Sequence, residues 1–213
     1  MRFYTNISRY GNNLLYRGYD DGRRVKKKIA FKPTLYVKGK CNSKFNALDG
    51  TNVDAIKLDS MREAKEFIEK YKDVENFKIY GNTNYIAQFI AEEFPGDITF
   101  DRSKIRVHVI DIEVASDEGF PEPDEAKHPV ISIAIKDSVL DTYFVWGLDD
   151  YKVEDSIMKQ YAVKYTKCNS EEQLLKFFIQ FWFEEHTTPD VVTGWNIRGF
   201  DIPYLVNRIK NML

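Results

Sequence analysis

The sequence is poor in cysteine, and this scarcity excludes several classes of protein. Its 213 residues include only Cys41 and Cys168, which lie far apart and belong to no Cys-x-x-Cys or Cys/His cluster. This arrangement favours free, buried thiols in a reducing compartment over a disulfide or a zinc site. No apolar run approaches the roughly 20 residues of a membrane-spanning helix, and the first three residues do not open a signal peptide. We therefore expect a soluble, cytoplasmic protein with no membrane partner.

A large excess of charge of either sign is also lacking. The formal net charge is -2 at pH 7, so overall charge predicts no affinity for nucleic acid, and any such affinity would depend on a local patch. The most basic stretch covers residues 23–28. We interpret it as a solvated strand whose lysines protect a sheet edge from further pairing. A phosphate-binding patch is the alternative.

Several catalytic signatures are missing as well. The chain has no G-x-S-x-G motif, no P-loop and no Cys/His pair, so an unrelated α/β hydrolase has little support. The three histidines, His108, His128 and His186, do not have the spacing of metal ligands and are expected to be structural or exposed. There is no internal repeat. With 43% hydrophobic residues, the chain can bury the core of one large domain or two small ones.

The first hundred residues combine strands with two helices. Alternating and β-branched segments predict strands over residues 2–10 and 14–19, followed by 25–31 and 34–37 as the continuation of the same meander. Ser60 and Glu63 form a capping-box pattern that predicts a helix over residues 60–71. A short strand at 77–80 and a helix at 83–93 complete this part. The polar segment 97–104 is expected to link it to the rest.

The second part alternates strands and helices. We expect strands at 105–114, 130–136 and 142–146 in an antiparallel meander, a helix at 170–185, a short strand at 191–193 and a helix from 200 to 213. Such an order predicts an α/β domain with a mixed sheet, in a chain that is α+β overall. The expected domains are therefore a β-rich N-terminal domain, 1–104, and a second domain, 105–213.

Two carboxylates interrupt the apolar strand at residues 107–114. Because strand side chains alternate, Asp111 and Glu113 point to the same face. The run is apolar enough to predict a strand buried on both faces, where an ionised carboxylate costs several kcal/mol. A metal ion is the usual compensation, and carboxylate oxygens suit Mg²⁺ or Mn²⁺. A buried salt bridge is the alternative.

A third carboxylate follows the predicted strand at 191–193. Asp201 lies at or near a helix start, after a glycine-containing loop. Such an acid can simply serve as the N-cap of the helix or as a partner of the helix dipole, which contributes roughly 0.5–2 kcal/mol. The metal hypothesis is favoured by the combination of D-x-E in an apolar strand with an N-x-x-x-F-D loop. Carboxylates from two neighbouring elements can converge on metal ions.

These segments resemble two motifs of one enzyme family. Residues 111–123, with 126–129 after them, resemble the first exonuclease motif of family B DNA polymerases, in the version found in the replicative polymerases of T-even bacteriophages. Residues 193–204, with 207–211 after them, resemble their second exonuclease motif. The resemblance extends over the whole chain, although it is looser before residue 105.

The resemblance implies a 3′→5′ proofreading exonuclease of the four-carboxylate class, with an RNase H-like fold, in a DNA-directed DNA polymerase. Asp111, Glu113 and Asp201 match three of the four metal-binding and catalytic carboxylates. The complete site of such enzymes holds two ions, Mg²⁺ or Mn²⁺, about 3.5–4 Å apart. In that scheme Asp111 bridges the ions, Glu113 holds the ion beside the nucleophile, and Asp201 holds the one beside the leaving group.

The resemblance also implies contacts with nucleic acid. Phe120 matches a phenylalanine that stacks near the 3′-terminal base, and base stacking contributes roughly 1–3 kcal/mol. Asn196 and Phe200 match residues beside the frayed single strand. The alternatives are a loop aromatic that packs on the core for Phe120, a loop-capping Asn196, and a core Phe200. For Trp195 we expect a place in the core.

One family feature does not follow the second motif in this sequence. The third exonuclease motif, Y-x-x-x-D, supplies a tyrosine and the fourth carboxylate, and neither Tyr161 nor Tyr204 is followed by Asp four residues later. The second domain is therefore expected to be a truncated, partial exonuclease domain with little or no activity alone. Its expected partners are single-stranded or primer–template DNA and the remaining exonuclease and polymerase portion, in the same chain or a separate subunit. If phage-encoded, it acts in the cytoplasm of an infected bacterium. The competing hypothesis is a non-catalytic nucleic-acid-binding or assembly module of a split polymerase.

Overall fold

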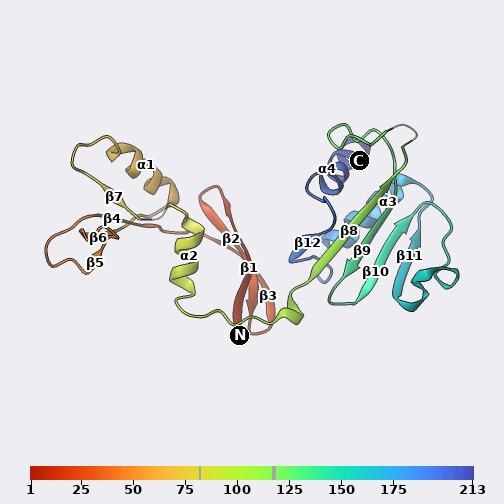
Figure 1. Ribbon diagram of the computed structural model, residues 1–213, viewed down its shortest axis with the longest axis horizontal. Helices are drawn as coiled ribbons and strands as arrows, with labels where there is room; N and C mark the ends of the chain where they lie inside the picture. The colour runs from red at the N-terminus through yellow and green to blue at the C-terminus, as the bar shows by residue number, and fades with distance from the viewer. Residues whose placement is uncertain (82, 117–118) are drawn as a thin grey trace. The chain divides into compact units, whose positions relative to one another are not determined.

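The chain forms two compact units, Met1–Phe100 and Asp101–Leu213. The computed structural model describes residues 1–81, 83–116 and 119–213 (Figure 1). Compactness alone does not define a domain, so the expected domains 1–104 and 105–213 stay a prediction. No helix among the described residues is long and apolar enough to cross a membrane.

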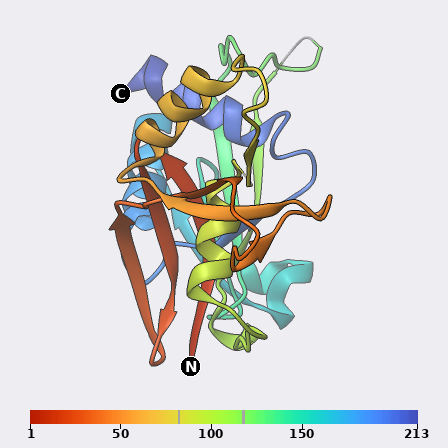
Figure 2. The ribbon, with the colours of Figure 1, turned by 90° about the vertical axis from the view of Figure 1, so that its left-hand side faces the viewer.

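The first unit contains two sheets and two helices. A three-stranded antiparallel sheet has the order β1-β2-β3, and a four-stranded sheet has the order β5-β6-β4-β7. Figure 2 shows the helices beside these strands. The elements are β1 (Arg2–Tyr10), β2 (Asn13–Asp20), β3 (Arg23–Ile29), β4 (Thr34–Lys38), β5 (Phe45–Asn46), β6 (Asn52–Lys57), α1 (Met61–Tyr71), β7 (Ile79–Tyr80) and α2 (Tyr85–Glu93).

Most of these elements were predictable from local patterns. The Ser60 hydroxyl accepts a hydrogen bond from the Glu63 amide at the start of α1, which confirms the capping box. The basic strand β3 lies at a sheet edge, as expected. The prediction that β4 continues the β1–β3 meander is wrong, because β4 pairs with β6 and β7 in the second sheet. The register of β4 is set by long-range pairing, which a local pattern does not reveal.

The second unit is built on a five-stranded mixed sheet, with the order β11-β10-β9-β8-β12 (Figure 1). The expected antiparallel meander of β8, β9 and β10 is confirmed, while β11 and β12 join parallel to β10 and β8. The elements are η1 (Arg102–Lys104), β8 (Val107–Val114), β9 (Val130–Asp137), β10 (Thr142–Gly147), η2 (Val153–Asp155), η3 (Ile157–Gln160), β11 (Ala162–Lys167), α3 (Glu171–Phe183), β12 (Val191–Thr193) and α4 (Asp201–Met212).

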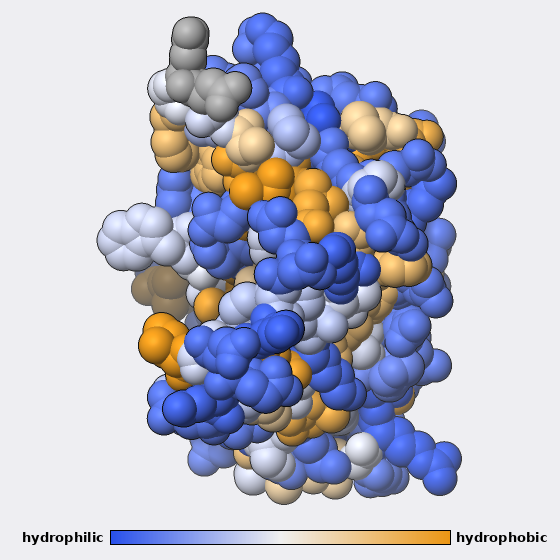
Figure 3. Space-filling model, turned by 90° about the vertical axis from the view of Figure 1, so that its right-hand side faces the viewer, coloured by the Kyte–Doolittle hydropathy of each residue, from blue (hydrophilic) through white to orange (hydrophobic). Residues whose placement is uncertain are grey.

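The core of this unit lies on one face of the sheet. Ile110 and Ile112 of β8 pack in one cluster with Leu174 and Leu175 of α3 and Leu205 of α4. On the outside, apolar side chains form small areas between hydrophilic ones, as Figure 3 shows for one face. The face in view therefore has no broad apolar patch of the kind that marks an interaction site.

Strand β8 differs from the expectation of burial on both faces, which is wrong. His108, Ile110 and Ile112 are buried, whereas Val109, Asp111 and Glu113 are exposed. The strand therefore alternates like one that is covered on one face only. The apolar residues at 107 and 109 made it resemble a fully buried strand. Because Asp111 and Glu113 are exposed, the desolvation cost inferred for them from the sequence does not arise.

The cysteines are both free, as expected, but only one of them is buried. Cys168 follows β11 and is almost inaccessible, while Cys41 is exposed in a turn. The expectation of two buried thiols is therefore wrong for Cys41. The sequence around this residue has no apolar run that could cover it.

Candidate metal centre and nucleic-acid interface

Asp111 and Glu113 lie side by side on the exposed face of β8. Their strand is central in the sheet, flanked by β9 and β12, so its backbone is held on both sides. Within residues 1–81, 83–116 and 119–213, neither carboxylate forms a salt bridge, which removes support for the buried ion pair considered as the alternative. Two unpaired carboxylates with a fixed spacing therefore project from a rigid strand.

Strand β12 pairs with β8 only as far as Val109. Beyond that point, next to Asp111, the loop that follows β12 lies along the edge of β8. Strand β12 ends at Thr193, which pairs with Val109. The next residue, Gly194, approaches β8 so closely that a Cβ atom there would lie 2.4 Å from the carbonyl oxygen of Ile110. Only glycine permits this approach without movement. The contact directs the chain towards the edge of β8 that carries Asp111.

Asp201 occupies the place along this edge that a longer β12 would fill. Its Oδ1 accepts a hydrogen bond from the backbone amide of Ile112 at 3.2 Å. Asp201 is the first residue of α4, whose N-cap residue is Phe200 with no capping side chain. Asp201 is therefore not the N-cap of α4, although it lies in the first turn, where an acid meets the helix dipole. Its side chain instead joins α4 to the strand that carries the other two carboxylates.

The electrostatic environment of Asp201 is unfavourable for a lone carboxylate. The residue is only 4% exposed. Burial raises the pKa of its carboxyl above the ordinary value, the negative charge of Asp111 raises it further, and backbone hydrogen bonds, including that from Ile112, partly oppose the shift. A cation at this position would remove both penalties. The buried carboxylate expected at 111 and 113 is thus found at 201.

Asp111 and Asp201 are brought together, but the three carboxylates do not form a closed ligand cluster. In the described part of the chain, no three His, Cys, Asp or Glu side chains are grouped closely enough to hold a metal ion. Glu113 instead lines a cavity of about 480 Å³ on the exposed sheet face, together with Tyr143 and Tyr165. The donors present are carboxylate oxygens, which fit Mg²⁺ or Mn²⁺ better than softer ions.

An aromatic group lies at the N-terminus of α4. Phe120, which is 72% exposed, has its ring 4.7 Å from that of Phe200, and Phe200 lies 5.3 Å from Tyr204. Phe200 is half-buried against the core, whereas Phe120 presents its ring to solvent. An exposed ring supported by a second ring is a suitable stacking platform for a base.

The loop between β12 and α4 has a conformation that depends on Asn196. This residue has a positive φ of 52°, and its carbonyl oxygen accepts hydrogen bonds from the amides of Gly199 and Phe200. Asparagine adopts this left-handed conformation more easily than most residues. These backbone contacts account for Asn196 as a loop residue. A contact with nucleic acid stays a prediction.

Trp195 does not lie in the core, so that expectation is wrong. It is 92% exposed, although it sits between Gly194 and Asn196 in the same loop. The close approach of Gly194 to β8 fixes the loop so that the next side chain points away from the sheet. A large exposed aromatic side chain in the loop that leads to Asp201 is a further candidate for stacking with a base.

The sequence reasoning missed a set of polar contacts that tie α4 to the segment after Phe120. Arg208 forms a bidentate ion pair with Glu171 of α3, with both N–O distances 2.7 Å, and also donates to the carbonyl oxygens of Ala126 and Lys127. The Tyr204 hydroxyl donates to the carbonyl oxygen of His128 at 2.8 Å. Asn207 and Asn211 donate to the carbonyls of Pro123 and Glu125.

These contacts follow a helical spacing that could have indicated them. Tyr204, Asn207, Arg208 and Asn211 occupy positions i, i+3, i+4 and i+7, so they lie on one face of α4. The other face, with Ile202, is apolar and meets α3. Helix α4 therefore holds the segment after the first carboxylate motif with its polar face.

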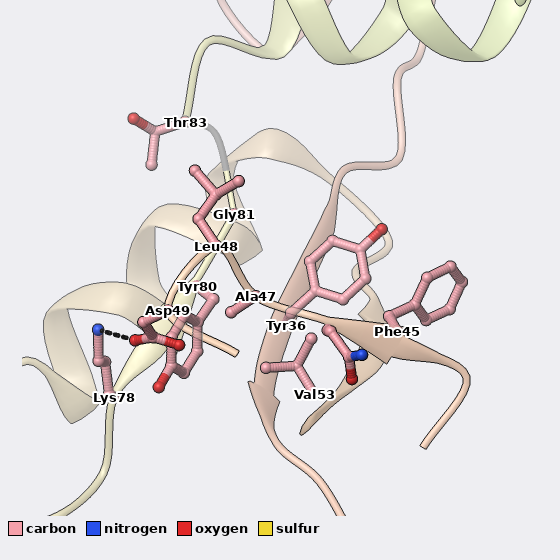
Figure 4. A pocket seen from close by; sticks show the side chains of 11 residues that line it. Tyr36, Phe45, Ala47, Leu48, Asp49, Val53, Lys78, Tyr80, Gly81 and Thr83 are labelled. Atoms are coloured by element: carbon pink, nitrogen blue, oxygen red, sulfur yellow. Dashed lines mark hydrogen bonds and ion pairs between the residues drawn. The ribbon is translucent and has the colours of Figure 1, made fainter. Parts of the chain in front are cut away.

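A cavity in the first unit holds none of the candidate residues. It has a volume of about 780 Å³ and is lined by aromatic side chains that include Tyr36, Phe45 and Tyr80 (Figure 4). Lys78 binds Asp49 at 2.9 Å at its rim, and that hydrogen bond lowers the pKa of Asp49 to about 2. The charged groups here neutralise each other, so the cavity offers no carboxylate pair for a metal ion.

Comparison with known proteins supports the family resemblance. Residues 58–213 match the model of the exonuclease domain of DNA polymerase family B. The chain is 30% identical to the DNA-directed DNA polymerase of Escherichia phage RB69 and 29% identical to that of Enterobacteria phage T4, in each case over 99% of this chain. It is also 34% identical, over 50% of its length, to the DNA polymerase delta catalytic subunit of Dictyostelium discoideum.

The chain matches only a small part of the length of each relative. The chain spans 26% of the length of the RB69 polymerase, 25% of the T4 polymerase and 9% of the Dictyostelium subunit. The matching family model covers most of the chain, and the mixed sheet with helices on one face agrees with an RNase H-like exonuclease domain. The chain therefore belongs to the family B DNA polymerases and carries sequence of their exonuclease domain.

Proposed function

We propose that this chain is the N-terminal part of a DNA polymerase and that residues 101–213 contribute to 3′→5′ hydrolysis of single-stranded DNA ends. The observation that carries the proposal is the buried Asp201 carboxylate, hydrogen-bonded to β8 beside the charge of Asp111. Such an arrangement is unfavourable unless a cation shares it. Among the described residues Asp201 is not an N-cap and forms no salt bridge, so its only stabilising contacts are backbone hydrogen bonds and the first turn of α4.

Exonuclease domains of this family generally use divalent metal ions. Asp111, Glu113 and Asp201 would hold them here, with Mg²⁺ or Mn²⁺ as the ions that suit oxygen donors. When bound, the ions would activate water and stabilise the leaving 3′ oxygen. The protein's own contribution is positional: Gly194 brings the loop to β8, and the amide of Ile112 fixes the carboxylate of Asp201.

The 3′ end of the DNA would lie against the exposed aromatic residues beside this centre. Phe120, supported by Phe200, offers one stacking surface, and Trp195 offers another. Asn196, which lies in the same loop as Trp195, would contact the strand. The aromatic residues would hold a base through its face, which suits a proofreading site because every base can stack.

The site is incomplete within these 213 residues, because no Y-x-x-x-D follows Asp201. The fourth carboxylate would come from the remaining polymerase, either in the same polypeptide or as a separate subunit. We expect little nuclease activity from the chain alone and restored cleavage when the remaining part is present. A non-catalytic module is the weaker alternative, since the family match lies in the exonuclease domain itself.

A binding experiment tests the proposal without requiring the complete site. Fluorescence anisotropy with a 3′-labelled oligo(dT) measures affinity in Mn²⁺ and in EDTA. We expect Mn²⁺ to strengthen binding of the wild type, and Asp201→Asn to abolish that gain. Asp73→Asn, an exposed acid in the first unit, is the matched control and keeps the gain. Equal affinity in Mn²⁺ and EDTA for the wild type would refute the proposal.

A further inference from the structure

The segment that begins at Phe120 is stiff because of its prolines. Residues 120–123 have the sequence Phe-Pro-Glu-Pro. Each proline ring fixes its own φ at about −65° and restricts the residue before it to an extended conformation. The backbone of this segment is therefore restricted throughout. A fixed point at Pro123 determines, through the stiff segment, where the ring of Phe120 lies.

Helix α4 provides this fixed point. The side-chain amide of Asn207 donates a hydrogen bond to the carbonyl oxygen of Pro123 at 3.0 Å. The same helix supports the other end of the segment, where the ring of Phe120 lies 4.7 Å from that of Phe200, the N-cap residue of α4. The segment 120–123 is thus attached to α4 at both ends. Asp201 begins the same helix, so one rigid element carries both attachments and the buried carboxylate.

The chain after Pro123 has separate attachments. The amide of Ala126 donates to the carbonyl oxygen of Glu122 at 2.9 Å, and Ala126 is fully buried with a positive φ of 43°. This conformation is uncommon for a residue with a side chain and persists where surrounding contacts impose it. Arg208 and Asn211 of α4 donate to the carbonyl oxygens of Ala126 and Glu125. Of these hydrogen bonds from α4, that of Asn207 is nearest to Phe120 along the chain.

We propose that Asn207 is a positioning residue for the DNA base that stacks on Phe120. Its side-chain amide binds Pro123, so it acts on the base through the stiff segment and the ring of Phe120. The inference rests on the proposed function, because it requires a base to stack there. Helix α4 then sets the place of the stacked base relative to Asp201.

Asn207 and Asn211 provide a matched pair of variants. Each donates from Nδ2 to a backbone carbonyl oxygen, at 3.0 Å and 3.1 Å, but the acceptor of Asn207 is nearer to Phe120. Alanine removes the donor without adding charge, and it has a higher helix propensity than asparagine. Asn207→Ala and Asn211→Ala should therefore both keep α4 intact. Only Asn207→Ala releases the end of the segment 120–123.

Fluorescence anisotropy in Mn²⁺ with 5′-labelled oligo(dT), whose 3′ end is unmodified, measures the effect on binding. Phe120→Ala should weaken binding about 5- to 150-fold, which is the range for the loss of one base–aromatic stack. Asn207→Ala should lose part of the same stack and weaken binding roughly 2- to 10-fold, whereas Asn211→Ala should bind like the wild type. Asn207→Ala should cause no further loss when Phe120 is already alanine, because it acts through that ring.

The double variant separates positioning from a general structural role. An equal loss from Asn207→Ala with and without Phe120 would overturn the proposal, as would equal losses in the two asparagine variants. Urea unfolding checks that each variant is folded, and Asn207→Asp, which keeps the size of the side chain but loses the donor, repeats the test without a cavity. Unchanged binding of Asn207→Ala beside weakened binding of Phe120→Ala would overturn the role of Asn207 alone. Unchanged binding of Phe120→Ala would overturn the stacking in the proposed function as well.

Discussion

Replacing Gly194 with alanine should disturb the candidate metal centre through a single methyl group. The added Cβ would lie 2.4 Å from the Ile110 carbonyl oxygen and 2.5 Å from Cγ2 of Ile197, whereas ordinary contacts begin at 3.4 Å. The nearest atom is a backbone atom of β8 and cannot turn away as a side chain would. The loop at Gly194 must therefore shift away from β8 to widen the contact from 2.4 Å to about 3.4 Å. Overpacking of this kind costs typically about 1–3 kcal/mol of unfolding free energy.

The same movement should reach Asp201. Its hydrogen bond to the Ile112 amide is already 3.2 Å long, and the loop that moves leads directly into α4. We expect Gly194→Ala to weaken Mn²⁺ binding in addition to lowering stability. The assays are urea unfolding in EDTA and calorimetric titration with Mn²⁺ below the unfolding transition.

Gly96→Ala is the control, because a Cβ at Gly96 meets nothing within 4 Å. It should change the unfolding free energy by less than about 1 kcal/mol and in either direction. The reasoning is refuted if Gly194→Ala is as stable as the Gly96 variant. It is also refuted if the variant loses stability but binds Mn²⁺ as the wild type does, because the glycine would then serve folding alone.

Three further variants test separate parts of the account. The pKa of Asp201 is raised above the ordinary value of 3.8, so the metal-free wild type loses stability as the pH rises from 3.8 through the raised pKa. Asp201→Asn should therefore have a larger unfolding free energy than the wild type at pH 7 in EDTA. The difference in unfolding free energy between the two proteins should vanish towards pH 3. Arg208→Met leaves the largely covered Glu171 carboxylate without its cationic partner, with the Val130 amide as a remaining donor. This should cost up to about 3–5 kcal/mol in urea unfolding and speed hydrogen exchange in residues 123–128, whereas Arg62→Met, at an exposed pair, should cost less than about 1 kcal/mol. Trp195→Phe should leave stability within about 0.5 kcal/mol and remove the tryptophan emission that acrylamide quenches most readily, and a destabilised variant would contradict the exposure of Trp195.

Local patterns predicted most elements of the fold but not all of their partners. The capping box at Ser60 predicted α1, and apolar segments predicted β8, β9 and β10. Strand β11, a short edge strand with the sequence AVKYTK, was missed because half of its residues are polar. Strand β6, with the sequence NVDAIK, was missed because it is also short and half polar, although it lies between β5 and β4. The pairing of β4 depends on β6 and β7, which are distant in sequence, so only the tertiary structure reveals it.

The sequence reasoning expected buried charge at the wrong carboxylates. Burial was expected for Asp111 and Glu113, but the covered face of β8 belongs to Ile110 and Ile112. The residue under electrostatic strain is Asp201, whose burial arises from Gly194 and the end of β12, and no local pattern encodes that arrangement. The polar face of α4 was visible as a helical spacing, but its partners are backbone carbonyls, which carry no sequence signature.

Calorimetric titration with Mn²⁺ of the wild type and of Asp111→Ala/Glu113→Ala tests the central claim most directly. Both substituted side chains are exposed and unpaired, so the double variant should fold as stably as the wild type. We predict measurable binding of Mn²⁺ to the wild type, its loss in the double variant, and its retention in Asp73→Asn. Identical titrations for the wild type and the double variant would contradict a metal centre at these carboxylates.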